Sequence, residues 1–416
     1  MNPPTNSSNN PDDDESRTTI LPPGIVESRN YAAKQQISAE IQAFLSGKVI
    51  SDGGGGDSDG ATKTSSHSEF RTFFTIWMFI TRLPSPSWID LHPGYLMRGM
   101  CYFPVAGSIL GGMYAIVFDC LHVSLGLPAP VAASVTIAVG LYITGCFHED
   151  GLADSADGMG GGWSRSQVLR IMTDSRVGTF GCAALSLFLF TKAQLLGSLE
   201  TSHWNANIWQ GGSSAGAGPA LLVAQTLSRL SAPYLIRTRD YVAEVGPKSP
   251  FYLFMVEAKH IVTWSRVLVA ILYCFVVSAS FYGPTMAIGL IVVVLSTAHL
   301  AGAKGQYLLG GVMGDFLGAT TCVCEILVLI LIASRDSIIE TYRLIAGTIQ
   351  FSDGSFGLSG FNQQIVVLYC QDRVRPLFHF LLLLAALKLW CTFVGPPDMY
   401  DREEKKEAEA ISEKND

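Results

Sequence analysis

Apolar residues along this chain occur in long runs that short polar segments separate. Eight of these runs are of about the length needed to cross a lipid bilayer as helices. They cover residues 102–125, 128–147, 177–199, 217–236, 264–282, 285–300, 316–333 and 376–394. A shorter run at 70–83 has 14 residues and ends at Pro84, so we expect an interfacial or re-entrant helix there. The pattern predicts an all-α, polytopic integral membrane bundle of about eight transmembrane helices plus this short helix.

Composition agrees with this class of protein, and charge divides the chain into parts. Of 416 residues, 49% are hydrophobic and 15% are charged, and the mean hydropathy is +0.31. The net charge of −7 belongs to the ends: residues 1–68 and 398–416 hold 9 basic and 17 acidic side chains, and the remainder holds 19 and 18. We expect a disordered polar and acidic tail at 1–68, a transmembrane domain at 69–396 and a charged tail at 397–416. The expected partner of the domain is the lipid bilayer, not nucleic acid.

Basic residues are distributed unevenly between the loops. If the eight runs cross the bilayer alternately, one face carries eleven Lys and Arg side chains, whereas the connections at 126–127, 200–216 and 283–284 on the other face carry none. The segment 334–375, with four arginines, is the exception. The positive-inside rule makes the basic face cytoplasmic or its organellar equivalent, in the cell inner membrane if the source is bacterial.

An acidic segment on that face, Phe-His-Glu-Asp-Gly-Leu-Ala-Asp-Ser-Ala-Asp-Gly at 147–158, is the strongest candidate for chemistry. On a helix, Asp150, Asp154 and Asp157 fall at i, i+4 and i+7, so three carboxylates share one side. Like charges one turn apart destabilise a helix unless a cation lies among them, and hard oxygen ligands favour Mg²⁺. A solvated acidic loop, or acids that favour a helix N-terminus, is the structural alternative.

Glycines and arginines follow the acids. Gly160 and Gly161 let backbone N–H groups approach a metal-bound phosphate. Arg165 could clamp an anionic substrate, although the positive-inside rule explains it equally well. Arg176 lies in Asp-Ser-Arg-Val-Gly-Thr-Phe-Gly at 174–181, at the mouth of a span, where the backbone can approach a ligand closely.

A second glycine cluster lies on the same face. Gly310, Gly311 and Gly314 precede Asp315 at the expected start of a helix. They predict an anion-binding nest beside a fourth metal carboxylate. An N-cap would explain Asp315, and small-residue helix packing would explain Gly314, but neither explains the Gly310–Gly311 pair.

Three ionisable residues fall inside the apolar runs. Lys192, Arg229 and Glu325 are costly to bury in lipid unless they face a polar cavity. Lys192 and Glu325 could form a structural pair, but a cavity that opens towards the aspartates fits all three. His148 differs from the other histidines because it adjoins the acidic segment.

These motifs closely resemble the cobalamin synthase family, the adenosylcobinamide-GDP ribazoletransferases. The resemblance runs in order from residue 70 to the last span, and it is carried by 147–158, 174–181, and these further motifs: Phe-Ile-Thr-Arg-Leu-Pro at 79–84, Leu-Ser-Arg at 227–229 and Gly-Gly-Val-Met-Gly-Asp-Phe-Leu-Gly-Ala at 310–319. It implies a polytopic membrane enzyme that needs Mg²⁺. Such an enzyme joins adenosylcobinamide-GDP to α-ribazole or its 5′-phosphate, gives adenosylcobalamin or its 5′-phosphate, and releases GMP.

The resemblance also implies roles for the candidate residues. Mg²⁺ on the diphosphate would be held by Asp150, Asp154, Asp157 and Asp315. Arg176 and Arg229 would stabilise the charge of the departing phosphate, and His148 or Glu149 would accept the proton of the nucleophile. Substrate binding falls to Arg165, Gly160, Gly161, Lys192, Gly310, Gly311 and Gly314.

The chain also departs from the family pattern. Met313 stands where Thr is usual and Cys322 where a polar side chain is common, and the segments 201–218 and 334–375 look like additions. Two alternatives stay open: a CDP-alcohol phosphotransferase, whose Asp-Gly motif continues with Ala-Arg, and a membrane transporter with Lys192 and Glu325 on an ion path. The sequence neither favours nor opposes a homo-oligomer.

Overall fold

The structure is a computed structural model that describes residues 41, 68–89, 91–199, 216–242 and 259–335. The chain divides after Ser66 into two units, and all described elements belong to the second. The expected disordered and charged tails, the eighth apolar run at 376–394 and the additions expected at 201–218 and 334–375 fall wholly or mostly outside the described residues.

The described elements are helical apart from one parallel β-bridge between Tyr241 and Val312. The α-helices are α2 (Glu69–Ile80), α3 (Pro93–Gly99), α4 (Phe103–Asp119), α5 (Ala129–Thr144), α6 (Phe147–Gly161), α7 (Arg165–Met172), α8 (Thr179–Ser198), α9 (Ala217–Ser228), α10 (Ser231–Thr238), α12 (Trp264–Tyr282), α13 (Pro284–Leu309) and α14 (Gly314–Ala333). Short 3₁₀ or π turns are η2 (Met100–Tyr102), η3 (Cys120–Ser124) and η5 (Lys259–Ile261).

Five of the described helices are long and apolar enough to cross a membrane: the continuous stretch Pro93–Ser124, α8, α12, α13 and α14. The bent pair of α5 and α6 makes a sixth if it counts as one span. The run expected as one span at 217–236 is instead divided between α9 and α10, each too short to cross alone. The all-helical membrane class is therefore confirmed with five to six candidate spans in the described part, and the expected count of eight is not reached there.

Helix α13 is longer than expected. The sequence predicted a loop from Leu300 to Phe316, but the helix continues to Leu309 and stops at Gly310, whose φ is +75°. Ala301, Ala303, Lys304 and Gln306 are good helix formers, so the polar residues do not end the helix, and it continues through Gly302 and Gly305. The connection to α14 is correspondingly short.

The turn between α5 and α6 aims the acidic helix. Gly145 and Cys146 have φ values of +66° and +61°, and the two helices meet at 91°. A left-handed conformation is unfavourable for a non-glycine residue, so neighbouring contacts must hold Cys146 there. Arg82 lies against the turn: a Cβ atom on Gly145 would be 2.2 Å from Arg82 Nε, and the Arg82 N–H donates to the Ile143 carbonyl.

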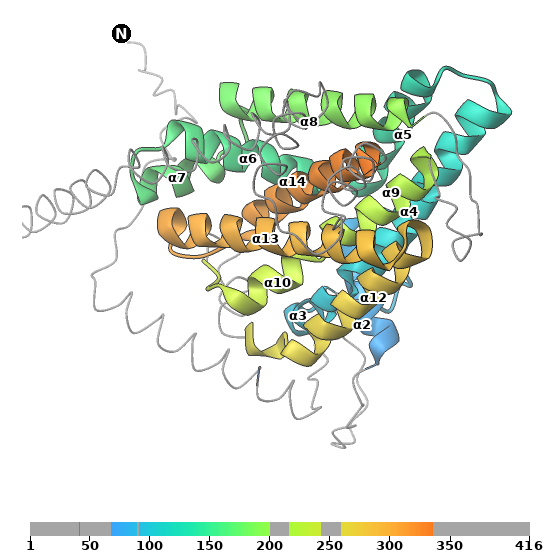
Figure 1. Ribbon diagram of the computed structural model, residues 1–416. Helices are drawn as coiled ribbons and strands as arrows, with labels where there is room; N and C mark the ends of the chain where they lie inside the picture. The colour runs from blue at the N-terminus through green and yellow to red at the C-terminus, as the bar shows by residue number, and fades with distance from the viewer. Residues whose placement is uncertain (1–40, 42–67, 90, 200–215, 243–258, 336–416) are drawn as a thin grey trace, which may run out of the picture. The chain divides into compact units, whose positions relative to one another are not determined.

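Helix α6 packs against both α8 and α14 (Figure 1). Glycines make both contacts close. A Cβ atom on Gly151 would lie 2.5 Å from the Asp315 carbonyl oxygen, and one on Gly318 would lie 3.2 Å from the His148 carbonyl oxygen. A Cβ atom on Gly181 would lie 2.8 Å from the Ala153 carbonyl oxygen. The core lies around α9, in which eleven of twelve residues are buried and which packs chiefly on α4 and α14.

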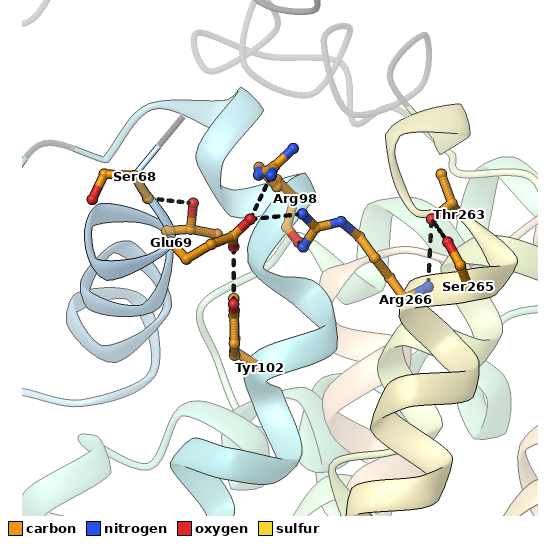
Figure 2. A network of polar contacts seen from close by, with 8 residues as sticks. Ser68, Glu69, Arg98, Tyr102, Thr263, Ser265 and Arg266 are labelled. Atoms are coloured by element: carbon orange, nitrogen blue, oxygen red, sulfur yellow. Dashed lines mark hydrogen bonds and ion pairs between the residues drawn. The ribbon is translucent and has the colours of Figure 1, made fainter. Parts of the chain in front are cut away.

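Helix α2 is the short helix expected near the start of the domain, and its 12 residues do not qualify as a span. Ser68 caps it, and Glu69 joins it to its neighbours. The Glu69 carboxylate accepts hydrogen bonds from Arg98, from Tyr102 at 2.9 Å and from Arg266 at 3.0 Å (Figure 2). Partial burial opposes the charged form, but these donors outweigh it and hold the pKa of Glu69 below its ordinary value.

Candidate functional site

The predicted site residues separate onto two sides of α6. His148 and Glu149 line a closed cavity, the buried chamber, together with Lys192 and Arg229. Asp150, Asp154 and Asp157 project from the roughly opposite side, because a helix turns about 100° per residue. We call this second side the aspartate face. The sequence placed all these residues in one site, whereas the structure forms two groups.

The buried chamber is lined by four helices that carry charged or amide side chains, and it measures about 20 Å³. Lys192 Nζ lies 2.6 Å from Glu325 Oε1, and Gln225 Nε2 donates to the same oxygen at 2.5 Å. Arg229 Nη1 donates to the Gln225 carbonyl oxygen at 3.0 Å and to the Gln225 side-chain oxygen. The Lys192 and Glu325 side chains are only 7% and 6% exposed, so this chain of contacts is shielded from solvent.

Three polar atoms of the residues that line the chamber have no partner in the described structure. They are Thr136 Oγ1, Glu149 Oε2 and Arg229 Nε, and all three are buried. A cavity of about 20 Å³ has room for about one water molecule, which could bridge polar groups of this kind. A cavity is therefore present around Lys192, Arg229 and Glu325, but it is small and does not open towards the aspartates as expected, because it lies on the other side of α6.

Asp157 connects the aspartate face to α8. Its Oδ2 accepts the Gly178 N–H at 2.7 Å, and its Oδ1 accepts the Gly181 N–H at 2.8 Å. Both donors lie at the N-terminus of α8, where unpaired N–H groups and the helix dipole favour an anion. Neither glycine tolerates a side chain here: a Cβ atom would lie 2.5 Å from Asp157 Oδ1 at Gly178 and 2.3 Å from Oδ2 at Gly181.

The remaining expected metal ligands lie near one another along α6. Asp150 is exposed, and Asp154 is half-buried one turn further on. Asp315 begins α14, and its backbone packs against Gly151 between them. Among the described residues, no group of three or more His, Cys, Asp or Glu side chains is close enough to hold a metal ion as the side chains stand. The four aspartates therefore stay predicted ligands.

Arg176 lies beside this face in an open hollow of about 260 Å³. Its side chain is 87% exposed and pairs with Asp174, Nη2 to Oδ2 at 2.6 Å, while its backbone N–H also donates to Asp174. These hydrogen bonds lower the pKa of Asp174 to about 2. The hollow also contains Asp157, Gly178 and Phe180, so Arg176 shares it with the N-terminus of α8.

The predicted phosphate-binding glycines serve mainly as contact points. The Phe180 ring lies over Gly160, 2.5 Å from a Cβ built there, and Ile171 lies 3.6 Å from one on Gly161. The Arg165 guanidinium lies over Gly310, with Nη2 2.6 Å from a Cβ built there. Arg165 is thus brought to the second glycine cluster.

The backbone explains the Gly310–Gly311 pair. Gly310 has the left-handed conformation that ends α13, and a Cβ atom on Gly311 would lie 2.4 Å from the Asp240 carbonyl oxygen. The N–H groups of Gly311 and Val312 already donate to the Gly305 and Asp240 carbonyl oxygens. Gly314 is exposed at the start of α14.

Sequence reasoning missed Gln225, the residue that connects Glu325 to Arg229. It is a polar residue inside an apolar run and lies four positions before Arg229, so the two side chains share one side of a helix. It also missed Gly107 and Gly111 of α4, which allow α9 to approach: a Cβ atom on Gly107 would lie 2.2 Å from the Gln225 carbonyl oxygen. The four-residue spacing of these glycines was the available signal.

Comparison with known proteins decides which family these features belong to. The family model described as cobalamin-5-phosphate synthase matches residues 72–333. The chain belongs to the cobalamin-5-phosphate synthase family. The matched region contains the buried chamber, the aspartate face and both glycine clusters. The family that the sequence motifs suggested is therefore confirmed.

Relatives in this family align over nearly their whole length. Adenosylcobinamide-GDP ribazoletransferase of Shewanella sp. strain W3-18-1 is 35% identical over 278 residues, which are 65% of this chain and 98% of the relative. The protein of the same name from Shewanella oneidensis is 34% identical, over 64% of this chain and 94% of the relative. That from Shewanella woodyi is 35% identical, over 61% and 92%. No solved structure matches the chain.

Proposed function

We propose that this chain is an adenosylcobinamide-GDP ribazoletransferase. It joins adenosylcobinamide-GDP to α-ribazole or its 5′-phosphate, forms adenosylcobalamin or its 5′-phosphate, and releases GMP. The observation that carries the proposal is the family match at 72–333, supported by relatives of that name of which up to 98% is covered. Family membership also favours this activity over the phosphotransferase and transporter alternatives.

The reaction takes place on the aspartate face. The 5′-oxygen of the ribazole forms a bond to the phosphorus attached to cobinamide, the bond from that phosphorus to the bridging oxygen breaks, and this oxygen leaves with GMP, while the hydroxyl proton passes to solvent. Little covalent chemistry falls to the protein in such a transfer, so binding and charge neutralisation dominate. The hollow beside Arg176 and the exposed Asp150 are open to solvent, whereas the buried chamber is shielded from it.

Asp150, Asp154 and Asp315 suit a Mg²⁺ ion by donor type, and their carboxylates would have to move together to hold it, because they are not close enough as they stand. All three offer carboxylate oxygens, and α14 begins against Gly151, between the first two. Asp157 offers only the lone pairs that its two backbone hydrogen bonds leave, so its main role is to fix α6 against α8. Bound there, Mg²⁺ would neutralise charge on the diphosphate.

Arginine side chains complete the substrate site. Arg176 exchanges Asp174 for a substrate phosphate, and Arg165 binds a second anionic group beside Gly310, with Gly160, Gly161, Gly311 and Gly314 nearby in the fold. The buried chamber contains His148, Glu149, Lys192 and Arg229. These residues act on α6 from the side opposite the aspartate face. The aspartate face lies on the cytoplasmic side or its organellar equivalent, as the basic loops predict.

The test is GMP release by the detergent-purified full chain, supplied with adenosylcobinamide-GDP and α-ribazole, first with Mg²⁺ and then with EDTA. We expect metal-dependent GMP and a cobalamin product in equal amounts. Folded protein that forms neither product with any divalent metal or with α-ribazole 5′-phosphate would contradict the proposal. Asp119→Asn, at the end of α4, is the matched carboxylate control and should stay active.

A further inference from the structure

Besides His148 and Tyr114, the buried chamber holds four ionisable side chains, and these come from four parts of the fold. Two can be basic, Lys192 of α8 and Arg229 after α9, and two can be acidic, Glu149 of α6 and Glu325 of α14. All four residues are at most 9% exposed. Charged side chains at such depth in a membrane protein are costly, so a specific role must retain them.

As it stands, the chamber is too small to admit a substrate. About 20 Å³ accommodates about one water molecule and not a nucleotide or a phosphate ester. Lys192 Nζ is already within 2.6 Å of Glu325, and the Arg229 guanidinium is bound to Gln225. The basic groups are therefore bound inside the protein.

The contacts form one continuous chain across the bundle. Glu325 Oε1 accepts from Lys192 and from Gln225 Nε2, so the amide of Gln225 must point its nitrogen towards α14. Its oxygen is then free to accept from Arg229. Each member fixes the orientation of the next, and removal of one leaves a buried charge without its partner.

This chain of contacts lies on the side of α6 opposite the aspartate face. Glu149 faces the chamber and is the neighbour of Asp150 in sequence, and the His148 backbone packs on Gly318 of α14. Residues of α6, α8 and α14 thus line the same chamber, and α6 packs on both of the other helices. A shift of about 1 Å in catalytic geometry can cost about 100-fold in rate.

We infer that Lys192, Gln225, Arg229 and Glu325 are positioning residues: a charge-balanced set that touches no substrate and holds α6 so that Asp150 and Asp154 lie correctly. The inference rests on the proposed function for its readout. It gives new roles to Gln225 and Glu325, and it moves Lys192 and Arg229 from phosphate binding to positioning.

Paired substitutions distinguish positioning from substrate binding. Lys192→Met leaves Glu325 charged without its ion pair, and Glu325→Gln leaves Lys192 without its carboxylate. The double variant removes both charges, and the oxygen of Gln at 325 can still accept from Gln225. We expect each single variant to lower kcat about tenfold or more with KM within about twofold, and the double variant to recover most of that loss.

The opposite pattern would overturn the inference. If Lys192 binds a substrate phosphate, KM rises equally in Lys192→Met and in the double variant, while Glu325→Gln stays close to the wild type. If the single variants do not fold, the double variant decides alone: a wild-type KM and recovered kcat support positioning, and a raised KM or an inactive folded protein refutes it. Ser278→Ala, a buried residue that donates within its own helix, is the matched control.

Failure of the proposed function itself would look different. In that case the wild-type chain would release no GMP, and no variant would be informative about kcat. A thermal melt of the same four proteins in detergent then still tests the charge balance, because the double variant should be more stable than either single variant.

Discussion

The two sides of α6 contrast in burial and in how their charges are satisfied. In the buried chamber, acidic and basic side chains are matched, and Gln225 connects them. On the aspartate face, carboxylates gather beside an open hollow, and Asp150 is exposed. Enclosed charges of both signs can balance one another inside the protein, whereas an excess of carboxylates on an accessible surface favours the binding of a cation. Neighbours in sequence, such as Glu149 and Asp150, can therefore serve different purposes.

The largest expected effect comes from the exposed side. Asp154→Asn removes one carboxylate charge with almost no change of shape, and we expect kcat to fall about 100-fold or more, because charge on the reacting phosphates is then less neutralised. The Mg²⁺ concentration for half-maximal rate should rise as well. GMP release across a Mg²⁺ titration measures both.

The stability of the Asp154→Asn protein provides the second half of this test. Its thermal midpoint should stay equal to or above that of the wild type, since repulsion along the aspartate face is reduced. Full activity in the folded variant would refute the metal assignment. A large loss of stability would instead mean that Asp154 has a structural role, as the residues of the chamber do.

The second prediction concerns Asp157, which belongs to the aspartate face by position but whose carboxylate accepts hydrogen bonds from two backbone N–H groups. Gly181→Ala puts a Cβ atom 2.3 Å from Asp157 Oδ2, so the carboxylate must leave the N-terminus of α8. We expect a loss of about 1–3 kcal/mol in the free energy of unfolding, and a lower kcat with an unchanged Mg²⁺ requirement. Thermal melts and Mg²⁺ titrations report these two quantities.

Gly289→Ala is the control for Gly181→Ala, because nothing lies within 4 Å of a Cβ atom at that position. It should be neutral or slightly stabilising, as expected for Ala in place of Gly in a helix. If Gly181→Ala changes the Mg²⁺ requirement as strongly as Asp154→Asn does, then Asp157 is a metal ligand first and a helix contact second.

The contrast also shows what could be predicted from the sequence. The apolar runs predicted a helical membrane protein, since long uninterrupted runs have few other stable structures, and the i, i+4, i+7 spacing correctly placed the aspartates on one side of a helix. The same spacing argument separates His148 and Glu149 from the aspartates, but proximity in sequence made them appear to belong to one site.

Long-range contacts account for what could not be predicted. The break between α9 and α10 and the 91° turn at Gly145 depend on packing against other helices and on Arg82. Lys192 and Glu325 were recognised as a potential pair, but Gln225 becomes meaningful only when α9 and α14 are seen together. The glycines of 158–162 and 310–311 read as phosphate loops, because sequence does not show that Phe180 and Arg165 cover two of them.

A smaller effect is expected at Arg176, whose exposed side chain pairs with the Asp174 carboxylate. Arg176→Ala should raise KM for adenosylcobinamide-GDP about tenfold with little change in stability, because a surface ion pair contributes little. The pKa of Asp174 is about 2, below its ordinary value of 3.8, so the pair persists above pH 4 and is lost only as the pH falls towards 2. The steady-state rate measured between pH 6 and 8 should therefore show no change caused by titration of Asp174. Lys304→Ala, on the exposed part of α13, is the control.

The smallest effect is expected far from either side of α6, in the Glu69 network. The pKa of Glu69 is lowered, so its stabilisation is fully present above the ordinary value of 4.5 and is lost as the pH falls through the lower, folded-state value. The difference in thermal midpoint between the wild type and Glu69→Gln should therefore be constant from pH 7 to about pH 5, and it should shrink as the pH falls further below 4.5. GMP release at pH 7 should be nearly equal in both, because this network lines neither the chamber nor the hollow. A strong loss of activity in Glu69→Gln would mean that α2 supports the reaction. The reaction would then depend on more of the bundle than the two sides of α6.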